Sequence, residues 1–136
     1  MTFLVERLAD LREHLLHLRD IRPRVGDAEA LRRDLSLRND ILFSLLVVCQ
    51  TVIDIAGELA GRRGIRFQDY TEAVRALTRI DDMPLPLVEQ LERLPGFRNV
   101  LIHEYVALDY DRVIEALAEL EAVEQFVGIV AQLEAR

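Results

Sequence analysis

The feature that most constrains this chain is one long, strongly apolar segment near its middle. Apolar residues recur with the helical period from residue 27 to residue 61. Between residues 45 and 56 they occupy most sides of the expected helix. A helix that is apolar on most sides is stable in water only when other elements surround it. We therefore expect this segment to be the central buried rod of a helical protein.

Helical signals also account for the rest of the chain. Leucines spaced four and three residues apart form a seam along a first helix, which ends where Pro23 and Gly26 break the pattern. Further helices are expected from 70 to 80, from 85 to 94 and from 110 to 135. Three helices are preceded by an aspartate that can cap them, namely Asp27, Asp69 and Asp109. The patterns predict an all-α protein, an antiparallel bundle of four to five helices.

Length and composition favour a single helical domain that spans residues 1–136. The one cysteine, Cys49, lies in the apolar run LLVVCQTVI and is expected to be a buried, unreactive thiol. No uninterrupted apolar run reaches the ~18 residues that a membrane-spanning helix needs. The N-terminus also lacks the basic-then-apolar pattern of a signal peptide. We expect a cytoplasmic protein that makes no membrane contact.

The net charge limits how the chain can bind nucleic acid. It is −7, and the 17 basic residues are all arginine. Proteins that hold nucleic acid by broad attraction to phosphates are normally basic. Any contact with RNA must therefore be local and built from a few arginines in a groove.

Two polar groups in the first half of the chain are candidate site residues. His14 and His17 share a helical face with two carboxylates, but a metal site would need further ligands from a second helix. We expect a solvated face there and no metal. Asp54 interrupts the apolar stretch VIDIAGEL, and a buried carboxylate needs a partner. It faces either an arginine such as Arg98 or the solvent, and the sequence leaves both alternatives open.

The segment GFRNVLIHEY places Arg98, Asn99, His103 and Tyr105 close together among apolar residues. If a helix begins after Pro95-Gly96, then Arg98 and Asn99 lie in its first turn, where free N–H groups favour an anion. His103 would lie about 7.5 Å farther along the axis, and Tyr105 two turns from Arg98 on its side. By spacing alone, an ion-paired arginine and a core histidine fit the same pattern.

The motif R-N-V-L-I-H-E-Y resembles the R-x-x-x-x-H-x-Y signature of the HEPN superfamily, in particular the HepT-like toxins of prokaryotic toxin–antitoxin pairs. The similarity covers nearly the whole chain. It includes the long second helix with an Asp-containing apolar stretch like VIDIAGEL, the motif after the fourth helix, and Gly96-Phe97 before the arginine.

The resemblance implies a metal-independent endoribonuclease toxin that needs no cofactor. Arg98 and His103 match the catalytic pair, and Asn99 matches the polar residue that often follows the arginine. Tyr105 matches the tyrosine that an MNT-type nucleotidyltransferase antitoxin modifies with AMP. The family also implies a homodimer in which two motifs meet at the interface. Two Arg98 side chains would then form a local positive pocket in an acidic protein.

Three alternatives compete with this interpretation. The same fold can serve as a non-catalytic module that binds a nucleotide or a nucleotidyltransferase. A histidine phosphotransfer domain is disfavoured, because such domains carry lysine and glycine after the histidine, whereas EYVAL follows His103 here. The third alternative is a helical dimer without any site, in which the leucine seam from Leu4 to Leu18 forms the interface.

Overall fold

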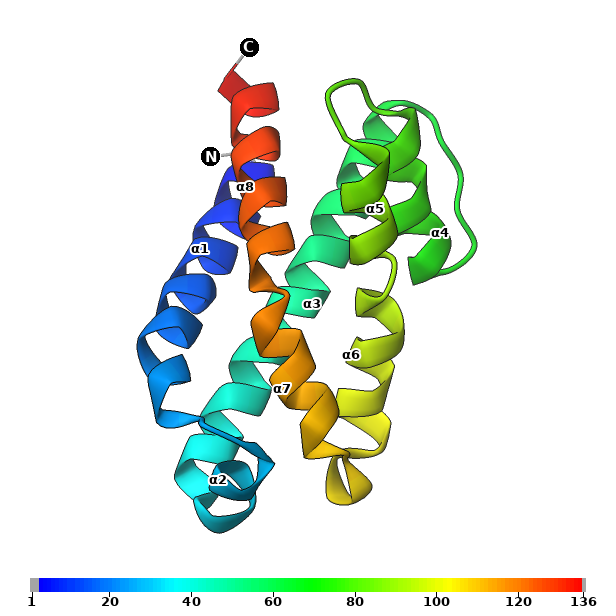
Figure 1. Ribbon diagram of the computed structural model, residues 1–136. Helices are drawn as coiled ribbons and strands as arrows, with labels where there is room; N and C mark the ends of the chain where they lie inside the picture. The colour runs from blue at the N-terminus through cyan, green and yellow to red at the C-terminus, as the bar shows by residue number, and fades with distance from the viewer. Residues whose placement is uncertain (1–2, 136) are drawn as a thin grey trace.

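The structure, a computed structural model, describes residues 3–135, except for the side chain of Tyr105. This part of the chain contains helices and no β-strand, so the all-α prediction is confirmed (Figure 1). The helices are α1 (Phe3–Ile21), η1 (Arg22–Arg24), α2 (Ala28–Arg33), α3 (Leu35–Arg62), α4 (Tyr70–Arg75), η2 (Ala76–Arg79), α5 (Leu85–Leu91), α6 (Leu94–His103), η3 (Tyr105–Ala107), α7 (Tyr110–Ala118) and α8 (Leu120–Ala135), where η marks a 3-10 helix.

The central rod predicted from the sequence is α3. Its apolar middle is buried, including Leu45, Val52 and Ile55, and α1, α4 and α6 pack around it. By length and composition alone, α3 is long and apolar enough to cross a membrane. This was not expected from the sequence, where an uninterrupted apolar run was required. However, 56% of its most apolar stretch is buried inside the protein. More than half of this stretch is therefore covered by neighbouring elements, as in the core helix of a bundle.

The leucine seam of α1 is buried within the chain itself. Its five leucines face α3 and α8, and the least exposed of them are fully buried: Leu4, Leu11 and Leu18, each 0% exposed. Figure 1 shows α1 and α8 side by side, with both chain ends near the same end of the bundle. The expectation that this seam could form an interface between copies is therefore wrong, because the seam is already covered.

The expected single helix from residue 27 to 61 is two helices, separated at Asp34. The backbone of Asp34 is extended, and its carboxylate accepts a hydrogen bond of 3.0 Å from the N–H of Leu37. The side chain thus caps α3 instead of continuing the helix. Leu35 follows the break and is 57% exposed, although the periodicity had placed it on the apolar face.

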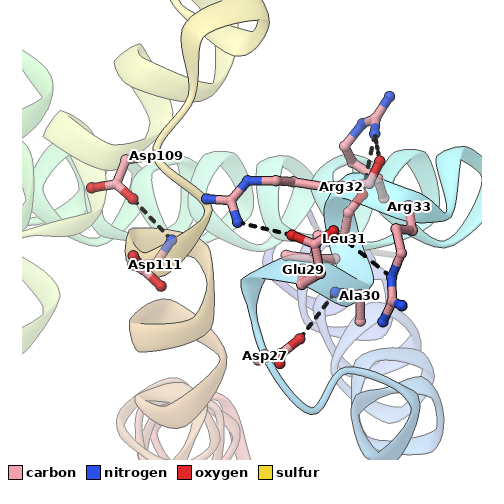
Figure 2. Close-up of polar contacts among 9 residues, drawn as sticks. Asp27, Glu29, Ala30, Leu31, Arg32, Arg33, Asp109 and Asp111 are labelled. Atoms are coloured by element: carbon pink, nitrogen blue, oxygen red, sulfur yellow. Dashed lines mark hydrogen bonds and ion pairs between the residues drawn. The ribbon is translucent and has the colours of Figure 1, made fainter.

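The three aspartate caps are confirmed. Asp27, Asp69 and Asp109 each accept a hydrogen bond from a backbone N–H in the first turn of the helix that follows. Figure 2 shows two of them at the corner where α2 packs against α7. These caps fix where α2, α4 and α7 begin.

The last expected helix also divides, because the chain leaves regular helix at Glu119 between α7 and α8. The Glu119 carboxylate lies 3.1 Å from the guanidinium of Arg93, just before α6. The expected helix from 70 to 80 is α4 followed by the 3-10 turn η2. More and shorter helices are present than the four to five predicted, although the bundle architecture is as expected.

The burial of the α1 seam predicts the effect of two matched substitutions. Leu11→Ala should lower the free energy of unfolding by about 2–5 kcal/mol, because it leaves a cavity against α3. Leu16 lies on the same helix but is 58% exposed, and Leu16→Ala should change stability by less than about 0.5 kcal/mol. Urea unfolding followed by circular dichroism measures both. Similar losses in the two variants would contradict this packing.

Candidate functional site

The motif segment lies mainly on α6, which packs against α3. Phe97 and Leu101 are buried toward the core, while Arg98 is half-buried and Asn99 and His103 are exposed. The expected start of this helix is wrong. Residue Leu94 begins α6, and Pro95 is accommodated in its first turn, where a missing N–H costs no hydrogen bond. Arg98 is therefore beyond the first turn, and free backbone N–H groups do not define the site.

Arg98 is held by neutral groups from three elements. Its Nε donates a hydrogen bond of 2.9 Å to Oε1 of Gln50 on α3. Its Nη1 donates a bond of 3.0 Å to Oδ1 of Asn99. The guanidinium carbon also lies 5.3 Å from the ring centre of Tyr70, at the start of α4. The side chain is thus fixed in direction while part of its surface remains accessible.

None of the ion pairs among the described residues involves Arg98. Other arginines of this acidic chain do pair with carboxylates, for example Arg75 with Glu92 at 3.2 Å. The alternative of an ion-paired structural arginine is therefore wrong for Arg98. A fixed guanidinium without a carboxylate partner keeps its full charge and its free N–H donors for an external anion.

Asp54 reaches Arg98 through Gln50. The Asp54 carboxylate accepts a hydrogen bond of 2.8 Å from Nε2 of Gln50, one turn earlier on α3. An ionised carboxylate only accepts hydrogen bonds, so it holds the NH₂ end of the Gln50 amide. The amide oxygen is then turned toward Arg98, which can only donate. Asp54 is only half-buried and lines an open groove, which agrees with the solvent alternative, and it reaches an arginine only through this Asp54–Gln50–Arg98 chain.

Sequence reasoning missed Gln50. It lies in the apolar stretch of α3 and carries no charge, so it was not predicted as a site residue. Its spacing of four residues from Asp54 was the available signal, since such residues are neighbours on one helical face. A second polar residue one turn from an unexplained carboxylate is a candidate partner for it.

His103 is the last residue of α6 and is exposed. It is therefore not the core histidine of the structural alternative. Among the described residues, no hydrogen bond or ion pair involves its imidazole. The helical rise of ~1.5 Å per residue places it about 7.5 Å along the axis from Arg98. The imidazole is thus free to reach a ligand bound at that arginine.

Tyr105 lies beyond the end of α6. The helix ends at His103, and the Tyr105 backbone belongs to the short turn η3. The expectation that a continuous helix carries Tyr105 on the side of Arg98 is therefore wrong. Its side chain lies outside the described part of the structure.

Other reactive groups of the chain have structural roles. Cys49 is buried, and burial raises the pKa of its thiol to about 12, although the charge of Arg98 acts in the opposite direction. It is therefore unreactive near neutral pH, as predicted. His14 and His17 do not simply form a solvated face, because they hydrogen-bond to Ser44 at 3.0 Å and to Asp40 at 2.7 Å on α3. Within residues 3–135, no cluster of His, Cys, Asp and Glu has the arrangement of a metal site.

Gln50 and Asp54 also line an open groove between α1 and α3. Ile102 of α6, next to His103, also lines this groove. A separate apolar cavity lies between α3, α5, α6, α7 and α8, but neither Arg98 nor His103 lines it. Arg98, Asn99 and His103 are not among the described residues that line the groove either. The groove adjoins the motif through Ile102 and through Gln50, which accepts a hydrogen bond from Arg98.

Comparison with known proteins identifies the family of the chain. The family model "Ribonuclease HepT-like" matches residues 6–130. The chain belongs to the HepT-like ribonuclease family. Within curated proteins it is 22% identical over 129 residues to "mRNA nuclease HepT" of Shewanella oneidensis, covering 93% of this chain and 95% of that protein. It is 28% identical over 83 residues to "Putative RNase" of Archaeoglobus fulgidus, covering 61% and 63% of the two chains.

Solved structures show the same fold. The tri-AMPylated HEPN toxin of Shewanella oneidensis, in complex with MNT antitoxin, superposes with a TM-score of 0.81 at 23% identity, covering 97% of this chain and 99% of that one. A substituted MntA–HpeT toxin–antitoxin structure gives a TM-score of 0.83 at 21% identity, with coverage of 96% and 99%. At this identity the likeness establishes the HepT-like fold of the chain.

Proposed function

We propose that this HepT-like chain is an endoribonuclease toxin that cleaves RNA without a metal ion or cofactor, with Arg98 and His103 as its catalytic residues. The proposal depends mainly on how the side chain of Arg98 is held. Its guanidinium is fixed by Gln50, Asn99 and Tyr70, yet no described carboxylate neutralises it. A half-buried, preoriented cation next to a groove is suited to a phosphodiester.

The chemistry uses the 2′-OH that adjoins each RNA phosphate. An imidazole accepts the 2′-OH proton, the 2′-oxygen attacks phosphorus, and the bond from phosphorus to the 5′-oxygen breaks. The leaving 5′-oxygen takes up a proton, and a 2′,3′-cyclic phosphate remains. Arg98 stabilises the negative charge that develops on the phosphoryl oxygens. Histidine suits the proton transfer because its ordinary pKa is near neutrality.

The remaining polar residues position the arginine. Asp54 sets the direction of the Gln50 amide, and Gln50 in turn accepts the Nε–H of Arg98. The amide oxygen of Asn99 accepts a hydrogen bond from Nη1 of Arg98. The NH₂ group of Asn99 is then available to donate to a phosphate oxygen. Asp54 and Gln50 thus act through Arg98, whereas Asn99 is placed to touch the substrate.

A homodimer would complete the site. Cleavage needs a group that accepts the 2′-OH proton and a group that supplies one to the leaving oxygen, whereas one chain offers one exposed imidazole in the motif. A twofold dimer with its motifs facing each other provides a second His103 and a second Arg98. It would also concentrate positive charge locally in a protein whose net charge is −7.

The partner we propose is an MNT-type nucleotidyltransferase antitoxin, in the cytoplasm, that transfers AMP to Tyr105. The similarity to an AMPylated HEPN toxin in complex with MNT antitoxin supports this pairing. Tyr105 lies in the turn directly after α6, two residues from His103. An AMP group there adds a bulky anion two residues from His103 and competes with the RNA phosphate for the motif. Inhibition then needs no change of fold.

One observation favours a second candidate function, a non-catalytic module that binds nucleotide or a nucleotidyltransferase. Within the described part of the chain, no residue orients the imidazole of His103, whereas a catalytic histidine is commonly oriented by a neighbour. The two functions differ in turnover, so a cleavage assay separates them.

Cleavage of an end-labelled RNA in EDTA tests the proposed activity. The wild-type chain should give products that end in cyclic phosphate, and His103→Ala should lower the rate at least about 100-fold because the proton acceptor is lost. His17→Ala is the matched control, since His17 bonds to Asp40 away from the motif, and it should cleave as the wild type does. A folded wild-type dimer that cannot cleave would favour the binding module.

Replacement of Tyr105 by Phe tests the modification. The variant should cleave RNA at nearly the wild-type rate but take up no AMP from a cognate nucleotidyltransferase and ATP, because the acceptor hydroxyl is missing. Mass spectrometry of the intact chain measures the uptake. Tyr110→Phe should still be modified, which controls for general effects of removing a hydroxyl. Continued AMP incorporation in Tyr105→Phe would overturn the assignment.

A further inference from the structure

Two exposed aromatic side chains lie along the surface of α3 that carries the Arg98 contact. The ring of Tyr70 is next to the Arg98 guanidinium, and 41% of this residue is exposed. Phe67 is 38% exposed, and its ring rests on Gly57 of α3. A Cβ at Gly57 would lie 3.2 Å from the tip of that ring, so the missing side chain makes the close approach possible.

The rings and the arginine share one strip of α3. Gln50, Asp54 and Gly57 are one helical turn apart in succession, so they lie on the same face. Gln50 holds Arg98 at one end, and Gly57 supports Phe67 about 10 Å farther along at ~1.5 Å per residue. The strip therefore joins a cation to exposed aromatic surface over the length of a few nucleotides.

The loop that supplies these rings is also basic. The sequence GRRGIRFQDY, residues 61–70, spans the end of α3, this loop and the first residue of α4. Arg62 is engaged by Glu58 and Glu134. In contrast, no described carboxylate pairs with Arg66, the residue before Phe67. A cation and aromatic rings in one loop are the features with which proteins hold the backbone and bases of single strands.

We propose that Tyr70, extended by Phe67, is a stacking site for the nucleobases of single-stranded RNA next to the phosphate held by Arg98. This inference rests on the proposed ribonuclease function and deepens it by naming the form of the substrate. The phosphate would use the N–H donors of Arg98 that remain, two on Nη2 and one on Nη1, because Nε–H and one Nη1–H already have partners. A base projects from the sugar next to its phosphate, which brings it to the ring beside that arginine. Stacking tolerates every base, so the site selects unpaired strands rather than a sequence.

Binding of two uncleavable oligonucleotides tests the site. One is a single-stranded 2′-O-methyl RNA of mixed sequence, and the other is an abasic phosphodiester strand of equal length. Fluorescence anisotropy gives Kd for each. Tyr70→Ala should raise Kd for the RNA about tenfold, since it removes one base-stacking partner, and change Kd for the abasic strand less than about twofold. Tyr70→Phe keeps the ring and should bind both strands as the wild type does.

Tyr110 offers a matched control. It also follows a capping aspartate at the start of a helix and lies against arginines, Arg32 and Arg38, but at the α2–α7 corner. Tyr110→Ala should leave both dissociation constants unchanged. Urea unfolding confirms that each variant is folded before it is used.

Three outcomes would overturn the inference. Equal weakening of both strands by Tyr70→Ala would show that the ring only positions Arg98. Weakening by Tyr70→Phe equal to that of Tyr70→Ala would assign the effect to the hydroxyl. Loss of self-association in Tyr70→Ala, seen by sedimentation, would make the ring a subunit contact. Cleavage by the wild type is measured separately, so failure of the proposed function is distinguishable from failure of the stacking site.

Discussion

Burial of α3 is the constraint on which the other elements depend. This helix of 28 residues is apolar on most sides, and it is stable in water only when its surface is covered. The buried seam of α1 covers one side along its length, and α4 and α6 cover others. Because these elements pack on one rod, α6, which carries most of the motif, is positioned chiefly by α3 and to a smaller extent by α4.

The candidate site lies where polar residues interrupt the apolar surface of α3. Asp54 and Gln50 interrupt the apolar surface of α3, and a half-buried carboxylate there needs a hydrogen-bond donor. Gln50 satisfies Asp54 and at the same time presents an oxygen to Arg98. The same arrangement therefore satisfies the core helix and fixes the cation of the motif. His103, the last residue of α6, remains exposed, so its imidazole is accessible to a bound substrate.

Patterns of residues close in sequence predicted most of the helices. The features that they did not predict depend mainly on contacts between residues far apart in sequence. The aspartate caps and the buried rod follow from residues close in sequence, so they could be anticipated. The break at Asp34 could not be separated from a continuing helix, because a side chain competes there with the backbone for the N–H of Leu37. The motif residues were predictable by resemblance. Gln50 and Tyr70 were not, since they meet Arg98 only through the packing of α3, α4 and α6.

The central claim is that α3 orients Arg98 for RNA cleavage through Gln50. The most direct measurement is the cleavage rate of Gln50→Leu beside Gln125→Leu, a substitution at an exposed glutamine of α8. Loss of a hydrogen bond to a charged group predicts that kcat falls about tenfold or more in Gln50→Leu, while urea unfolding shows that this variant is still folded under the assay conditions and Gln125→Leu keeps the wild-type rate. A folded Gln50→Leu variant that cleaves RNA as fast as the wild type would contradict the claim.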